Sequence, residues 1–284
     1  MSVFEADVHV DWLYYLKAAL LGIIEGLTEF LPVSSTGHLI VFEDLLHFNS
    51  PNRETFIIAI QAGAILAVCW DYRERLLAVL RGLFSERRQQ RLVVNVSIAF
   101  LPAALIGVLF SKFIKSVLFY PVPVATALVV GGIVILLVER VHAKPGYVPR
   151  VATMDDMSWS DALKVGCLQC LALIPGTSRS GSTIIGGLLV GLSRTAATEF
   201  SFFLAIPTVI GATVYELYKA RDQLAVADLP AIGLAFVMAF VAAMLVVRWL
   251  LRFVSKHDFR VFGWYRIVFG GVILFTFWTG LVTW

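Results

Sequence analysis

The chain has 284 residues, of which 59% are hydrophobic and only 15% are charged, and its mean hydropathy is +0.83. Soluble domains use about 45–50% apolar residues, so this composition excludes an ordinary soluble protein and predicts a membrane protein. In such a protein the net charge of +3 reflects orientation in the membrane rather than an anionic partner. The partners we expect are membrane lipids, and nothing predicts binding of nucleic acid.

Apolar stretches of two kinds alternate along the chain. Residues 12–46 are apolar but interrupted by Pro32-Val33-Ser34-Ser35-Thr36-Gly37, and residues 159–192 are interrupted by Pro175-Gly176-Thr177-Ser178-Arg179-Ser180-Gly181. Uninterrupted stretches that approach the length of a bilayer crossing are residues 55–70, 92–110, 122–138, 200–215, 229–250 and 264–283. We expect six spanning helices and two re-entrant hairpins, because broken backbone at membrane depth needs protein or a water-filled cavity around it.

The two halves of the chain resemble each other. Gly22-x-x-Glu25 followed by Pro32-x-Ser34-Ser35 parallels Gly166-x-x-Gln169 followed by Pro175-x-Thr177-Ser178, and residues 129–134 match residues 268–273. We therefore predict one all-α polytopic membrane domain over residues 1–284, built from two repeats. The first repeat covers 12–140 with its hairpin at 12–46, and the second covers 159–284 with its hairpin at 159–192. Because each repeat has three crossings, the second is inverted.

Basic residues predict the orientation of this domain. They gather in three loops that the topology places on one side, namely Arg73, Arg75, Arg81, Arg87, Arg88 and Arg91, then Arg140, Lys144 and Arg150, then Arg248, Arg252, Lys256 and Arg260. The positive-inside rule makes that side cytoplasmic. Both termini are then expected outside, with the first hairpin entering from outside and the second from inside.

Two acidic residues lie within the first hairpin. Glu25 and Glu29 are four residues apart, so both carboxylates share one helical face, and each is costly at membrane depth. A divalent cation would hold them together, and Mg²⁺ or Ca²⁺ suits carboxylate oxygens and substrate phosphates. The alternative is an ion pair with Arg179.

Hydroxyl groups follow the first break. Ser34, Ser35 and Thr36 offer hydroxyls and backbone N–H groups that can bind an anion where a helix restarts, although the same residues are typical of turns and caps. His38 could be a hydrogen-bonded core histidine, but its polar neighbours favour catalysis.

The second break has the composition of a phosphate cradle. Arg179 stands among the hydroxyls of Ser178, Ser180 and Thr183, and an arginine can hold phosphate through two parallel hydrogen bonds. Arg179 could instead only neutralise the glutamates. Either interpretation places the two breaks in contact, as inverted repeats commonly do near the bilayer midplane.

The segments Glu25-Gly26-Leu27-Thr28-Glu29 and Pro175-Gly176-Thr177-Ser178-Arg179-Ser180-Gly181-Ser182-Thr183 resemble the bacterial undecaprenyl-diphosphate phosphatase family, also called bacitracin-resistance proteins. The resemblance covers essentially the whole chain. It implies a multi-pass enzyme of the bacterial inner membrane that uses a divalent cation to hydrolyse undecaprenyl diphosphate to undecaprenyl phosphate, the lipid carrier of peptidoglycan synthesis. It also implies a periplasmic site and a homodimer.

Carried over to this chain, the resemblance makes Glu25 and Glu29 the essential acids and metal ligands, and Arg179 the phosphate-binding arginine. Ser35 and His38 mark the region of the nucleophile, with supporting roles for Ser34, Thr36, Ser178, Ser180 and Thr183. Attack by Ser35, by His38 or by water remain alternatives.

Two other functions are compatible with parts of this pattern. Inverted repeats with broken helices are also typical of secondary transporters, so a transporter or lipid-carrier flippase with an anion site at the midplane is the main alternative. An intramembrane protease using Ser35 and His38 would leave Arg179 and the glutamates unexplained. The lipid tail requires a lateral opening, for which Gly186, Gly187 and Gly191 are candidates, unless they serve helix packing.

Overall fold

The computed structural model describes residues 12–50, 52–220 and 228–280. The described part is helical apart from its connections and one isolated bridge between Val151 and Leu192. The prediction of an all-α polytopic membrane protein is confirmed, because six of the described helices are long and apolar enough to cross a membrane.

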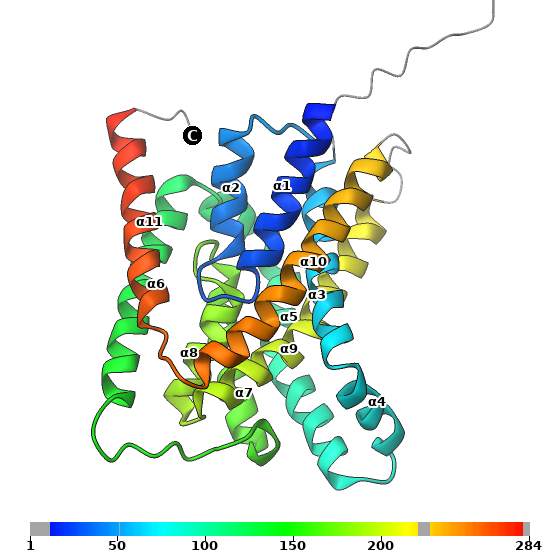
Figure 1. Ribbon diagram of the computed structural model, residues 1–284, viewed down its shortest axis with the longest axis vertical. Coiled ribbons are helices and arrows are strands. Elements are labelled where there is room, and N and C mark those ends of the chain that lie inside the picture. Colours follow the sequence, from blue (N-terminus) through cyan, green and yellow to red (C-terminus); the bar gives the residue numbers. More distant parts are fainter. Residues whose placement is uncertain (1–11, 51, 221–227, 281–284) are drawn as a thin grey trace, which may run out of the picture.

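Two helical hairpins, each broken at its tip, belong to the two halves of the chain. The first consists of α1 (Trp12–Thr28) and α2 (Ser35–Leu45), and the second of α7 (Trp159–Gln169), the 3₁₀ turn η2 (Cys170–Leu173) and α8 (Arg179–Val190). Figure 1 shows the first hairpin entering from the side where α1 begins and α11 ends, and the second from the opposite side. Their tips lie near the middle of the molecule, as the sequence predicts.

Three membrane-spanning helices follow each hairpin. They are α3 (Arg53–Asp71), α5 (Arg87–Leu118) and α6 (Pro121–His142) in the first half, and α9 (Arg194–Ala220), α10 (Leu229–Val254) and α11 (Arg260–Thr279) in the second. This arrangement agrees with two inverted repeats, although a duplication as such stays a prediction. The connections that carry the basic residues lie on the side of the molecule opposite the start of α1 (Figure 1).

The connection after α3 differs from the prediction of a loop. It contains α4 (Arg73–Gly82), whose Leu76 and Val79 pack against the main hydrophobic core. These two residues are three apart and so share one helical face, while the Arg73 side chain is half-exposed. The basic composition of this connection concealed a short amphipathic helix.

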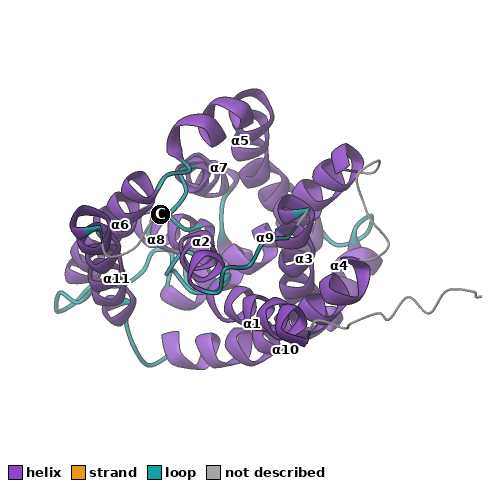
Figure 2. Ribbon diagram, turned by 90° about the horizontal axis from the view of Figure 1, so that it is seen from above, coloured by secondary structure: helices purple, strands orange, loops and turns teal. Residues whose placement is uncertain are grey.

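Small residues let the helices approach closely around the first hairpin. A Cβ atom added to Gly22 of α1 would lie 2.2 Å from the carbonyl oxygen of Ala235 in α10, and one added to Gly63 of α3 would lie 2.4 Å from that of Phe236. Helix α10 therefore packs against α1 and α3 backbone to backbone, as is usual in membranes. Figure 2 shows α10 lying across α1 in the view from above.

A buried ion pair joins three helices at the end with the basic connections. The carboxylate of Glu139 in α6 is fully buried and accepts from Arg194 of α9, with the closest contact at 2.5 Å. It also accepts from the backbone N–H of Phe259, the N-cap of α11, at 2.9 Å. These contacts tie α6 to the starts of α9 and α11.

Candidate active site

The two breaks restart their helices in the same way. Ser34 precedes α2 with φ of 70° and Ser178 precedes α8 with φ of 76°, a left-handed conformation that is uncommon for a residue with a side chain. Each serine hydroxyl caps its helix by accepting from a glycine N–H three residues later, Gly37 at 3.3 Å and Gly181 at 3.0 Å. Such strained residues are held in place only by their surroundings and cluster at functional sites.

This shared conformation corrects the alignment of the two halves by one residue. Matching Pro32 with Pro175 pairs Ser35 with Ser178, but the structure makes Ser34 the counterpart of Ser178. Ser35 and Arg179 are therefore equivalent, and each is the first residue of its helix. Aligning the halves on their prolines gives the wrong register, because Pro32 lies two residues before its cap serine whereas Pro175 lies three residues before its own.

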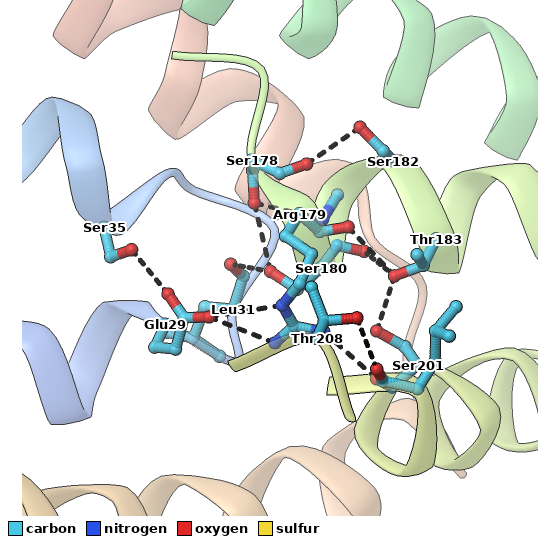
Figure 3. A network of polar contacts seen from close by, with 12 residues as sticks. Glu29, Leu31, Ser35, Ser178, Arg179, Ser180, Ser182, Thr183, Ser201 and Thr208 are labelled. Atoms are coloured by element: carbon cyan, nitrogen blue, oxygen red, sulfur yellow. Dashed lines mark hydrogen bonds and ion pairs between the residues drawn. The ribbon is translucent and has the colours of Figure 1, made fainter. Parts of the chain in front are cut away.

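Ser35 and Arg179 meet at the carboxylate of Glu29 (Figure 3). The hydroxyl of Ser35 donates to Oε2 of Glu29 at 2.6 Å. The Nε and Nη2 atoms of Arg179 both donate to Oε1 at 3.2 Å. Only 9% of the Glu29 side chain and 11% of the Arg179 side chain is exposed. The structure thus brings together three of the predicted residues, Ser35, Arg179 and Glu29, which we call the triad. They form the expected contact between the breaks.

The other hydroxyls of the second break hold the scaffold. Ser180 donates to the carbonyl of Leu31 in the first break at 2.7 Å, and its hydroxyl lies 3.0 Å from that of Ser178. The hydroxyl of Thr183 lies 2.6 Å from the hydroxyl of Ser201 in α9. The backbone carbonyl of Ser201 accepts from Nη1 of Arg179 at 3.1 Å. Binding of substrate by Ser180 or Thr183 stays a prediction. Ser201 was not predicted from the sequence, because a serine in an apolar helix carries no signal by itself.

The hydrogen bonds of His38 go to residues outside this triad. Its Nδ1 lies 2.8 Å from the carbonyl of Ser34, which can only accept, so Nδ1 carries the proton and Nε2 accepts from the hydroxyl of Tyr265 at 2.6 Å. The ring also stacks on Phe269 of α11 at 4.4 Å. Both ring nitrogens are therefore occupied by partners other than Ser35, and a catalytic role for His38 stays a prediction.

Glu25 has the features of a cation ligand. It is fully buried, and neither of its carboxylate oxygens has a hydrogen-bond partner among the described residues. The backbone N–H of Glu29 donates to the carbonyl of Glu25 at 2.9 Å, so the helical turn joining them persists past the end of α1. A buried carboxylate without a partner is costly, and a cation would compensate it.

The described residues contain no group of three or more His, Cys, Asp or Glu side chains that could hold a metal ion. Glu25 and Glu29 could supply two carboxylates, and Mg²⁺ is commonly bound by one or two carboxylates together with substrate phosphates and water. The residues present therefore fit a cation that binds together with a phosphorylated substrate. They do not fit a fully protein-coordinated metal.

A cavity of about 500 Å³ leads from the triad between α5 and α9. Glu29, Ser35 and Arg179 line it together with Ser34, Thr36 and Ser178, and the rest of its wall is mostly apolar, including Gly107 of α5 and Gly211 of α9. The predicted opening near Gly186, Gly187 and Gly191 is not this cavity, but Gly186 lines a second, mostly apolar cavity of about 480 Å³ between α6 and α8. A Cβ on Gly187 would lie 2.8 Å from the Cβ of Ala197 in α9, so Gly187 serves helix packing, which was the alternative interpretation.

One buried residue of the site was overlooked in the sequence. Arg266 of α11 is 1% exposed and donates to backbone carbonyls of both breaks. A charged residue within the apolar stretch 264–283 indicates an intramembrane site. Arg266 was not predicted because only the basic residues of the loops were considered.

The arrangement suits attack of a hydroxyl on an electrophile that carries negative charge. The Ser35 hydroxyl faces an acceptor, Glu29, that can take its proton, and Arg179 orients that acceptor. The N-termini of α2 and α8, with their backbone N–H groups and positive dipole ends, converge on the same cavity and favour an anion there.

Comparison with known proteins gives consistent matches over nearly the whole chain. A family model described as bacitracin resistance protein BacA matches residues 18–272. A protein from Cupriavidus metallidurans named undecaprenyl-diphosphatase is 56% identical over 285 residues, which covers 95% of this chain and 97% of the relative. Proteins of the same name from Nitrosomonas europaea and Janthinobacterium sp. (strain Marseille) are each 58% identical over 275 residues, covering 97% of this chain and 99% of the relative.

Proposed function

The chain belongs to the bacitracin resistance protein BacA family, and we propose that it hydrolyses undecaprenyl diphosphate to undecaprenyl phosphate and inorganic phosphate. The relatives named undecaprenyl-diphosphatase are similar to it over nearly their whole length. This activity recycles the lipid carrier of peptidoglycan synthesis, which accounts for bacitracin resistance. The observation that carries the proposal is the contact of Ser35 and Arg179 with Glu29 at the wall of one cavity.

The geometry favours Ser35 as the nucleophile and Glu29 as its base. Ser35 already donates to Glu29 at 2.6 Å, within the reach that proton transfer needs. The serine oxygen forms a bond to the terminal phosphorus, its proton passes to Glu29, and the bond from that phosphorus to the bridging oxygen breaks. Undecaprenyl phosphate leaves. Water then attacks the phosphorus of the phosphoserine, the bond from that phosphorus to the serine oxygen breaks, and this oxygen takes the proton back from Glu29 as inorganic phosphate is released.

Arg179 has two tasks in this scheme. Three of its N–H groups are engaged by Glu29 and by the carbonyl of Ser201, and a guanidinium has two more, which can donate to phosphoryl oxygens. Charge on those oxygens is what the transition state of phosphoryl transfer must stabilise. The backbone N–H groups at the start of α2 and α8 serve the same purpose.

A divalent cation, Mg²⁺ or Ca²⁺, held by Glu25 and Glu29 is part of the proposal. It would neutralise charge on the diphosphate and stabilise the leaving group. Support comes from the buried, unpartnered carboxylate of Glu25 and from the number of oxygen ligands that a diphosphate itself supplies.

The remaining features concern the lipid and the cell. The largely apolar cavity between α5 and α9 suits the first isoprenyl units of the tail, with the diphosphate at the triad. The positive-inside rule favours termini on the periplasmic side, and the resemblance to the family implies an inner-membrane protein whose site is reached from that side. Assembly as a homodimer, which resemblance to the family implies, is tested by crosslinking of the protein in membranes.

The test that separates hydrolysis from transport uses purified protein in liposomes loaded with undecaprenyl diphosphate. A phosphatase releases inorganic phosphate in proportion to the protein added, and Ser35→Ala abolishes the release. A flippase or transporter would move the intact lipid between leaflets without releasing phosphate. Translocation of uncleaved lipid by Ser35→Ala at the wild-type rate, together with no phosphate release by wild type, would refute the proposal.

A further inference from the structure

Arg266 is an intramembrane arginine whose hydrogen bonds all go to the backbone. Its Nε donates to the carbonyl of Leu128 at 3.2 Å, and its Nη2 donates to Ala127 at 3.1 Å and Gly176 at 2.9 Å. Its Nη1 donates to Pro32 at 3.1 Å and Thr177 at 2.9 Å. These five bonds use every N–H group that a guanidinium has, so Arg266 keeps no donor for substrate.

The carbonyls that Arg266 contacts belong to three separate segments. Pro32 lies in the first break, Gly176 lies in the second, and Ala127 lies in α6. Pro32 and Gly176 each stand two residues before a strained cap serine, Ser34 or Ser178, so Arg266 contacts equivalent carbonyls of the two halves. At membrane depth such carbonyls would otherwise lack partners. One side chain therefore ties both breaks to each other and to α6.

The fold leaves space for this guanidinium at two glycines. A Cβ atom on Gly131 of α6 would lie 2.2 Å from Nη2 and 2.8 Å from Cζ of Arg266. A Cβ on Gly181 of α8 would lie 3.1 Å from Nη1. Larger residues at these positions would displace the end of the arginine rather than the helix backbone.

We propose that Arg266 is a positioning residue that fixes the relative placement of the two breaks, so that Ser35 and Arg179 both reach Glu29. The planar fork is essential, because three segments are held at once by donors in fixed directions, whereas a lysine offers a point charge on a flexible stem. The effect on catalysis rests on the proposed phosphatase function, but the effect on the breaks does not.

The experiment compares Arg266→Met, Arg266→Lys and Gly131→Ala with wild type in detergent. Gly271→Ala is the matched control, because a Cβ at Gly271 meets nothing within 4 Å. Amide hydrogen exchange is followed in peptides covering residues 29–37 and 174–181, and kcat and KM are measured as phosphate release from undecaprenyl diphosphate. Gly131→Ala retains the arginine, so the test does not depend on the folding of Arg266→Met.

All three variants are expected to raise exchange in both break peptides by about tenfold or more, while peptides from α10 exchange as in wild type. We expect kcat to fall about 100-fold, because a misplacement of about 1 Å can cost that much. KM is expected to change less than about threefold, because the cavity between α5 and α9 remains. Gly271→Ala should match wild type in every measurement.

Three results would overturn the proposal. Unchanged exchange in the break peptides would show that Arg266 does not hold them. A wild-type kcat for Arg266→Lys would show that charge, rather than the fork, is needed. Exchange that rises equally throughout the protein would indicate a general loss of stability. If wild type released no phosphate, the proposed function would fail, and the exchange data would still decide whether Arg266 positions the breaks.

Discussion

Replacing Arg179 with lysine keeps the positive charge but removes the planar guanidinium group with its several N–H donors. In the structure Nε and Nη2 both donate to Glu29, and Nη1 donates to the carbonyl of Ser201. A lysine ammonium can replace one of these contacts but cannot orient Glu29 and grip a phosphoryl oxygen together. Loss of one preorganised donor to a transition state costs about 2.7–4 kcal/mol. At about 1.36 kcal/mol per tenfold change, kcat should fall by about 100- to 1,000-fold.

The assay is phosphate release from undecaprenyl diphosphate by purified Arg179→Lys in detergent, at saturating substrate. Arg248→Lys is the matched control, because Arg248 forms a half-exposed ion pair with Asp71, outside the cavity. It should retain most of the wild-type activity, since exposed pairs contribute little. A folded Arg179→Lys protein with more than about half of the wild-type kcat would refute the argument from geometry.

Four further predictions follow from the site and its frame. Ser35→Ala and Glu29→Gln should each lower kcat by about 100-fold or more, and acid-quenched wild type, but not Ser35→Ala, should carry a phosphoryl group on the peptide containing Ser35. A chelator should stop phosphate release, Mg²⁺ or Ca²⁺ should restore it, and Glu25→Gln should require about tenfold more cation; activity that ignores the chelator would contradict this. Gly107→Leu should fill the cavity and raise KM for the long-chain lipid about tenfold, with little effect on a short-chain diphosphate. Glu139→Ala should destabilise the protein by about 2 kcal/mol and so lower its melting temperature, but kcat per folded molecule should not change. This destabilisation is less than the loss of a fully buried ion pair costs, because 29% of the Arg194 side chain is exposed.

The sequence was sufficient to predict the membrane class, the six crossings and the two broken hairpins. These features depend on the length of apolar runs and on the cost of broken backbone in lipid, and both are properties of short segments. The contact between Arg179 and Glu29 was also predictable, because inverted repeats bring their breaks together and the charges are complementary.

The partners of individual side chains were not predictable in the same way. His38 is separated from Tyr265 by most of the chain, and their hydrogen bond depends on how α11 packs beside α2. The equivalence of Ser35 with Arg179 depends on backbone angles at the caps, which a proline pattern does not specify. The cavity between α5 and α9 depends on gaps left by packing, for which Gly107 gave no distinct signal.

Glu29 is central to the proposed composite phosphatase site, because it acts there as the base. The most direct test is phosphate release from undecaprenyl diphosphate by purified wild type and Glu29→Gln, measured with Mg²⁺ in the same preparation. We predict sustained release by wild type and a loss of about 100-fold or more in the variant. Equal rates for the two proteins, or no release from folded wild type, would contradict the account.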